Sequence, residues 1–101
     1  MYIWKYKIPI KDSFEIEMPR NARVLCVQPQ LEFRDYPLKP IETSCIWVKT
    51  SGKDELVKRR FVIVGTGNPF DAEGLVYIGT WQEAEGRLVW HLFERLDMVG
   101  L

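Results

Sequence analysis

The residues with the clearest chemical potential form a glycine turn after an apolar run. Residues 61–70 read FVIVGTGNPF, so a strand-like pattern stops at Gly65, Thr66, Gly67 and Asn68. A glycine turn after a strand can cradle a phosphate, because its backbone N–H groups bind anions. The dinucleotide fingerprint needs a third glycine and a helix, and the P-loop needs Gly-Lys-Ser or Gly-Lys-Thr, so both motifs are absent. We therefore expect the turn to redirect the chain, with an anion nest completed by the Thr66 hydroxyl as the alternative.

A basic run of Lys58, Arg59 and Arg60 leads into the same apolar segment. Alternation along a strand places Arg59 on the opposite face from Lys58 and Arg60. The run is typical of a solvated edge strand that its charge protects from aggregation. Alternatively, the arginines clamp a phosphate or a carboxylate, since a guanidinium fork suits the geometry of either anion.

The only histidine, His91, lies in the segment LVWHLFE, which is apolar on both strand faces. A metal site would need Cys, Asp or Glu partners at ligand spacing, and the sequence shows no such cluster. It also shows no nucleophile–base pair and no paired carboxylates arranged for acid–base chemistry. We expect a hydrogen-bonded structural or interface histidine, with a ligand contact as the alternative, in a protein that is not an enzyme and uses no metal or cofactor.

Composition restricts the function further. The 101 residues carry 14 basic and 14 acidic side chains, so no global field attracts nucleic acid or an anionic membrane. At 47% hydrophobic and 13% aromatic, the chain suits one compact domain over residues 1–101. Cys26 and Cys45 lack metal-ligand spacing, which favours free thiols in a reducing cytosol over a disulfide between neighbouring strands. Because neither a signal peptide nor a membrane-spanning run is visible, the expected location is cytoplasmic.

Short segments with a period of two dominate the chain and predict strands. Lys11, Asp12 and Ser13 predict a tight turn that joins the first two strands as a hairpin. The third strand is apolar on both faces, so we expect it at the centre of a sheet. The last two strands have the spacing of a hairpin. The strands are expected at residues 2–7, 14–18, 22–28, 44–50, 56–64, 75–82 and 87–94.

Residues 29–40 break this pattern, because Pro29, Pro37 and Pro40 interrupt the apolar residues. We expect a proline-stiffened loop that caps the core, with a ligand lid as the alternative. The best helical candidate is the tail, residues 92–99, since no segment has a sustained period of 3.6. The elements predict an all-β fold: a single small antiparallel β-sandwich or barrel of about seven strands, with a short C-terminal helical turn at most.

Six segments occur in a recognisable order: KYKIPI, EIEMPRNARVLCVQPQ, CIWV, RRFVIVGTGNPF, YIGTW and LVWHLFE. Together they resemble an uncharacterised family of small phage, prophage and bacterial proteins. Residues 31–43 depart from that pattern as an insertion. The resemblance implies no activity. It does imply a setting among the accessory genes of mobile elements, whose products often bind host proteins or sequester nucleotide immune signals.

In that setting we expect a phage- or prophage-encoded homo-oligomer in the host cytoplasm, an anti-defence protein that sequesters a small anionic, nucleotide-type signal without catalysis. The alternative is an interaction module that docks on a host or virion protein. Neither a membrane nor bulk nucleic acid is an expected partner. Ligand binding would use backbone donors, arginines, hydroxyls and aromatic rings, supplied by Trp47, Arg59, Arg60, Gly65, Thr66, Gly67, Asn68, Tyr77, Thr80, Trp81 and His91.

Overall fold

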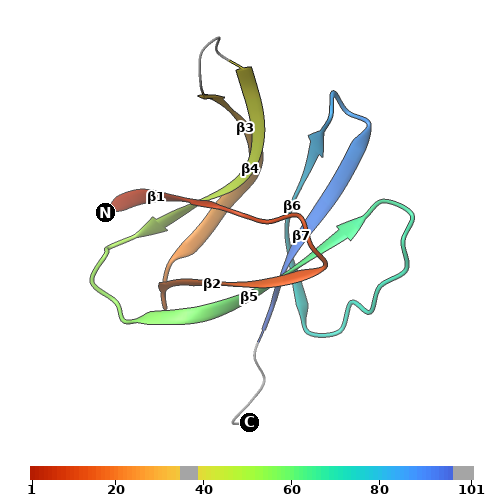
Figure 1. Cartoon of the computed structure of the whole chain (residues 1–101). Helices are drawn as coiled ribbons and strands as arrows, with labels where there is room; N and C mark the ends of the chain where they lie inside the picture. The colour runs from red at the N-terminus through yellow and green to blue at the C-terminus, as the bar shows by residue number, and fades with distance from the viewer. Residues whose placement is uncertain (35–38, 97–101) are drawn as a thin grey trace.

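The computed structural model describes residues 1–34 and 39–96, which form two antiparallel sheets in a sandwich-like arrangement (Figure 1). One sheet has the strand order β1-β4-β3 and the other has the order β2-β5-β7-β6. The all-β prediction is therefore confirmed. No helix in these ranges is long and apolar enough to cross a membrane. The strands are β1 (Tyr2–Lys7), β2 (Ser13–Pro19), β3 (Arg23–Arg34), β4 (Lys39–Thr50), β5 (Leu56–Gly65), β6 (Leu75–Glu83) and β7 (Leu88–Arg95).

The core lies between the two sheets. Ile46 and Val48 of β4 are fully buried, as are Phe61 of β5 and Leu92 of β7. Phe61 also stacks on Phe14 of β2, with 5.5 Å between the ring centroids. Because successive strand residues point to opposite sides, each sheet has an inner face in this core and an outer face that faces away from it. A candidate binding residue on a strand therefore lies either in the core or on an outer face.

The predicted hairpin between the first two strands is wrong. β1 pairs with β4, whereas β2 pairs with β5 in the other sheet. The chain crosses between the sheets at residues 8–12, where Ile8 N donates to Ser44 O (2.9 Å) and Ile63 N donates to Asp12 O (3.0 Å). Ile8 is buried in the core. Residues 11–13, which the sequence predicts to be a tight turn, therefore belong to the connection between the two sheets. This connection places Ile8 in the core.

The predicted proline-stiffened loop is also wrong for the described residues. β3 continues to Arg34 and β4 begins at Lys39, so Pro29 lies opposite Ser44 and Pro40 lies opposite Phe33 in a long hairpin. Proline is tolerated where a strand has no neighbour on its N–H side. β3 is at the edge of its sheet, and β1 reaches β4 only over residues 45–50. Residues 35–38 of the predicted loop lie outside the described residues.

Two predictions of strand position are reversed. β3 was expected at a sheet centre and lies at an edge, whereas β5 was expected at an edge and lies between β2 and β7. Charge pairing explains how β5 is accommodated: Glu15 and Glu17 of β2 lie opposite Arg60 and Lys58. Opposite charges across neighbouring strands remove the repulsion that would otherwise expel a basic strand from the sheet interior.

The hairpin predicted for the last two strands is confirmed. β6 pairs with β7 through a turn in which Ala84 and Glu85 have φ of 52° and 58°, and Gly86 has φ of 84°. The predicted helical tail is wrong for residues 92–95, which continue β7. Hydrogen bonding on both sides, to β5 and to β6, holds this segment extended. Residues 97–101 lie outside the described residues.

Candidate functional site

The glycine turn redirects the chain after β5, as predicted. Asn68 N donates to Gly65 O (3.1 Å), and Gly67 has a φ of +88°, a left-handed conformation that favours glycine. Gly65 is needed for a different reason. A Cβ at Gly65 would lie 2.8 Å from Asn68 Nδ2 and 3.3 Å from Trp90 Cζ3. One glycine therefore provides the turn conformation and the other provides a close approach.

A chain of hydrogen bonds connects this turn to β7 and β6. His91 Nε2 is 2.8 Å from Thr66 Oγ1, and His91 Nδ1 is 2.9 Å from Thr80 Oγ1. Thr80 Oγ1 in turn lies 2.6 Å from the Tyr77 hydroxyl. Each hydroxyl can donate or accept, so the two threonines satisfy both ring nitrogens in either tautomer. The hydrogen-bonded histidine predicted from the sequence is confirmed, and four of the predicted site residues meet here.

Aromatic rings lie beside the hydrogen-bonded chain. Phe93 is 5.2 Å from Phe70 and 5.6 Å from Tyr77 between ring centroids, the second pair edge to face. Phe70, Phe93 and His91 line a pocket of about 240 Å³ together with residues 64–68. Phe70 and Tyr77 are about half exposed, at 48% and 57%. Sequence reasoning missed Phe70 and Phe93, although Phe93 follows His91 by two residues and must share its strand face.

The register of β5 and β7 adds arginines to the same face. Arg60 lies opposite Arg95, Val62 opposite Phe93 and Val64 opposite His91. Strand residues two apart are separated by about 6.7 Å, so the arginine row lies about 13 Å from the histidine row. We call this outer surface of the four-stranded sheet the His91 face; it comprises Arg60, Thr66, Phe70, Tyr77, Thr80, His91, Phe93 and Arg95.

Both arginines of the His91 face are accessible. Arg60 Nε lies 3.5 Å from Glu15 Oε1, and both side chains are about half exposed, so water screens the pair. Arg95 is exposed, and no ion pair involves it among residues 1–34 and 39–96. Sequence reasoning missed Arg95. The alternation of strand residues could have identified Arg95, since residues 91, 93 and 95 share one face of β7.

Arg59 does not join this face. Its Nε and Nη2 donate to the two carboxylate oxygens of Glu94 at 2.6 and 2.7 Å, and its Nη1 donates to Ala22 O. The side chains of Arg59 and Glu94 are 16% and 17% exposed. Burial raises the pKa of the Tyr6 hydroxyl, and the charge of Arg59 opposes that rise. The guanidinium is thus committed to a mostly buried ion pair at the inner face.

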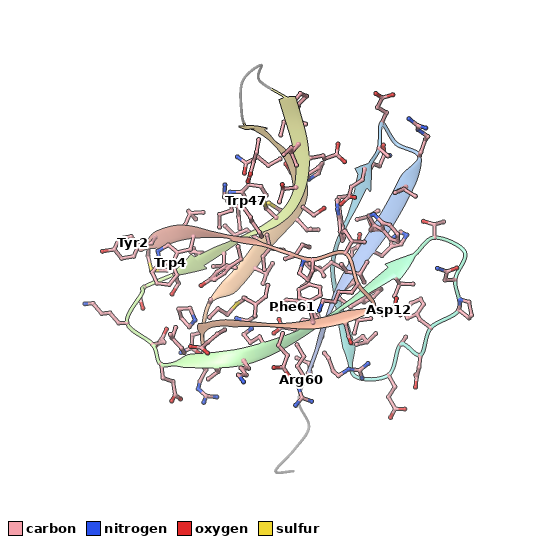
Figure 2. The ribbon with its side chains drawn as sticks, in the orientation of Figure 1. Tyr2, Trp4, Asp12, Trp47, Arg60 and Phe61 are labelled. Atoms are coloured by element: carbon pink, nitrogen blue, oxygen red, sulfur yellow. The ribbon has the colours of Figure 1, made fainter. Side chains whose placement is uncertain are left out.

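The two tryptophans of the predicted set also lie elsewhere. Figure 2 shows Trp47 on β4 of the three-stranded sheet, well away from Arg60 on β5. Trp81 is buried, and its indole N–H donates to Ser44 Oγ at 2.8 Å between the sheets. Trp81 therefore belongs to the core. The structure brings together the glycine turn, Arg60, Tyr77, Thr80 and His91, and it separates them from Arg59, Trp47 and Trp81.

The described residues offer little for metal or thiol chemistry. No group of three or more His, Cys, Asp or Glu in this part of the chain is placed to hold a metal ion. Cys26 and Cys45 are both free, as predicted, and Cys45 is fully buried. Burial raises the pKa of the Cys45 thiol, which keeps it protonated. The groups that meet on the His91 face are hydrogen-bonding side chains, aromatic rings and arginine charges.

Comparison with known proteins identifies the family. A family model described as a domain of unknown function, DUF7352, matches residues 1–99. This agrees with the resemblance to an uncharacterised family noted in the sequence. No curated protein and no solved structure matches the chain significantly. Because the match spans almost all of its length, the chain belongs to the DUF7352 family.

Proposed function

We propose that this protein is a non-enzymatic binding protein that captures a small nucleotide-type ligand on its His91 face. One observation carries the proposal: the β5–β7 register places arginines, aromatic rings and a hydroxyl-bonded histidine in three successive rows. A nucleotide presents phosphate, base and sugar in one molecule. The sugar lies between the other two, so the His91 face offers matching groups for the two ends, the phosphate and the base.

The chemistry of each row supports this assignment. Arginine forks bind phosphate oxygens in two-point contacts, so Arg60 and Arg95 suit the anionic end. Phe93 and Tyr77 offer rings for base stacking, which tolerates any base because every base has a π-face. The Thr66 and Thr80 hydroxyls, which His91 holds in place through its two ring nitrogens, offer hydrogen bonds to a base edge. The three rows extend over about 13 Å, a length on the scale of one nucleotide.

The proposed role in the cell rests on the resemblance of the sequence to phage and prophage proteins. A protein that holds a nucleotide without converting it lowers the free concentration of that nucleotide. We propose that it acts as an anti-defence protein that sequesters a signalling nucleotide in the host cytoplasm. A second copy covering the His91 face would enclose the ligand and bury the exposed Phe70 and Tyr77 rings, so the proposal includes a homo-oligomer.

Native mass spectrometry of gently purified protein, followed by calorimetric titration with adenosine diphosphate and a cyclic dinucleotide, tests this function. We expect an oligomer that binds at least one of these nucleotides. Phe93→Ala should weaken binding about 5- to 150-fold through lost stacking. Arg95→Ala should also weaken binding, because it removes a contact to the phosphate. Arg87→Ala removes an exposed arginine from the β6–β7 turn and serves as the control. No binding, or equal weakening by Arg87→Ala, would contradict the proposal.

A second candidate function rests on the β3–β4 hairpin. Figure 1 shows this hairpin extending past the region where β1 pairs with β4. Its Leu31 and Ile41 are 57% and 40% exposed. Exposed apolar residues on a projecting hairpin are suited to docking on a host or virion protein. Loss of a stoichiometric partner on Leu31→Lys with Ile41→Lys, and its retention on Phe93→Ala, would favour this function over nucleotide capture.

A further inference from the structure

The outer face of the three-stranded sheet forms a second, separate surface. Ile46 and Val48 of β4 are fully buried, so Trp47 and Lys49 between and beside them point outward. In the register, Trp47 lies between Lys5 of β1 and Cys26 of β3. We call this surface the Trp47 face; it comprises Lys5, Lys7, Arg23, Cys26, Trp47 and Lys49.

The Trp47 face is basic although the protein is neutral. Lys49 lies opposite Arg23, and Lys5 and Lys7 extend along β1. Glu32 is the one acidic residue among the described residues of this outer face; it pairs with Lys7 at 3.0 Å. Lys5 Nζ donates to Gln30 Oε1 at 2.6 Å, a neutral partner that leaves its charge uncompensated. Four basic side chains and one acidic side chain give this surface a local excess of positive charge, although the net charge of the whole chain is zero.

A single aromatic ring lies within this positive field. Trp47 is only partly buried, so part of its side chain is accessible to solvent beside Lys5. Proteins that bind single-stranded nucleic acid combine these two features: basic side chains follow the phosphates, and aromatic rings stack with bases. Lysine suits the phosphate role because its flexible ammonium requires no fixed geometry. Charge complementarity therefore favours a polyanion that also has flat, stackable groups.

We propose that the Trp47 face binds a short stretch of single-stranded nucleic acid, with a base stacked on Trp47 and phosphates held by Lys5, Lys7, Lys49 and Arg23. The site lies on a different sheet from the His91 face, so it goes beyond nucleotide capture and does not depend on it. Binding is independent of sequence, since none of these side chains is arranged to read base edges.

Fluorescence anisotropy with a labelled oligothymidine of about 12 nucleotides tests the proposal. Affinity should fall between about 50 and 200 mM salt, with a log–log slope near −3 if all four basic residues contact phosphates. Trp47→Ala should weaken binding about 5- to 150-fold. Lys49→Glu, at an exposed position, keeps the test valid if Trp47→Ala fails to fold. Arg87→Glu makes a charge reversal of the same kind on the other sheet and should leave binding unchanged.

Three results would overturn the proposal. The first is an absence of binding at the lower salt concentration. The second is an equal loss of affinity from Arg87→Glu and Lys49→Glu. The third is competition by polyglutamate as effective as competition by oligothymidine at equal charge, which would show that the Trp47 face recognises an acidic protein instead. Lys49→Glu should not change nucleotide binding at the His91 face, so failure of one proposal is distinguishable from failure of the other.

Discussion

The two outer faces of the sandwich carry their basic residues in different ways. On the His91 face, Arg60 and Arg95 lie directly opposite each other at one end of an aromatic and hydroxyl-rich surface. On the Trp47 face, lysines from β1 and β4 surround one tryptophan. The first arrangement concentrates charge at one end, as a small ligand with one anionic end requires. The second spreads charge along the sheet, as a polymer requires.

Neighbours in the sequence are poor guides to partners in a site. Arg59 and Arg60 are adjacent, yet one is committed to Glu94 at the inner face and the other is exposed on the outer face. Arg60 and Arg95 are far apart in sequence and lie opposite each other. In an all-β protein, alternation and register decide which side chains meet.

The largest expected effect separates the adjacent arginines. Arg59→Ala leaves the Glu94 carboxylate mostly buried without its partner, so the free energy of unfolding should fall by about 3 kcal/mol. Arg60→Ala removes a screened surface pair and should lower it by less than about 1 kcal/mol. Urea denaturation of both variants measures the difference. Equal costs would contradict the assignment of Arg59 to the inner face.

The next effect tests whether the two faces bind different ligands. Arg60→Ala with Arg95→Ala should weaken nucleotide binding at least about tenfold, because charge-assisted contacts to phosphate are lost. The same variant should change oligothymidine binding by less than about twofold, since it leaves the Trp47 face intact. Lys5→Ala with Lys49→Ala should show the reverse pattern. Parallel titrations of both ligands measure this, and a variant that weakens binding of both ligands equally would show that the two faces are not separate sites.

A smaller effect concerns the glycine turn that supports the His91 face. Gly67 has positive φ and no atom within 4 Å of an added Cβ, so Gly67→Ala should cost about 1–2 kcal/mol through backbone strain alone. Gly67→Asn is the matched control, because asparagine tolerates the left-handed region better. Thermal unfolding of the two variants compares them. A cost for Asn that exceeds the cost for Ala would show that the strain lies elsewhere.

The smallest effect is chemical and probes the Trp47 face. Burial raises the pKa of the Cys45 thiol, so at a given pH it has less thiolate than an ordinary cysteine and should alkylate slowly. Cys26 is only partly buried on the same sheet and should react first. Iodoacetamide labelling followed by peptide mapping measures the order, and labelling of Cys45 should increase as pH rises. Faster labelling of Cys45 would contradict its burial.

The sequence predicts local features of this protein better than it predicts partners. Alternation located β5, β6 and β7 to within one or two residues at each end. The hairpin of β1 and β2 failed because turn residues fit many connections, including one that crosses from one sheet to the other and buries Ile8 between them. The loop predicted at Pro29 and Pro40 failed because a proline at an unpaired strand edge looks identical, in sequence, to a proline in a loop.

The candidate site was predicted in part for the same reason. Thr66, Thr80 and His91 meet as a hydrogen-bonded group, which agrees with their selection from the sequence. Arg95 and Phe93 were missed, although alternation from His91 identifies both once β7 is known to continue to Arg95. Sorting residues between two sheets requires the strand order, which no local pattern contains.

Chemical-shift mapping of labelled protein during titration with a nucleotide locates the binding site residue by residue. If the His91 face is the nucleotide site, the amide signals of Thr66, Thr80, His91, Phe93 and Arg95 should shift together and saturate, while those of Lys5, Trp47 and Lys49 do not move. Shifts confined to the Trp47 face, or no saturable shifts on either face, would contradict this assignment.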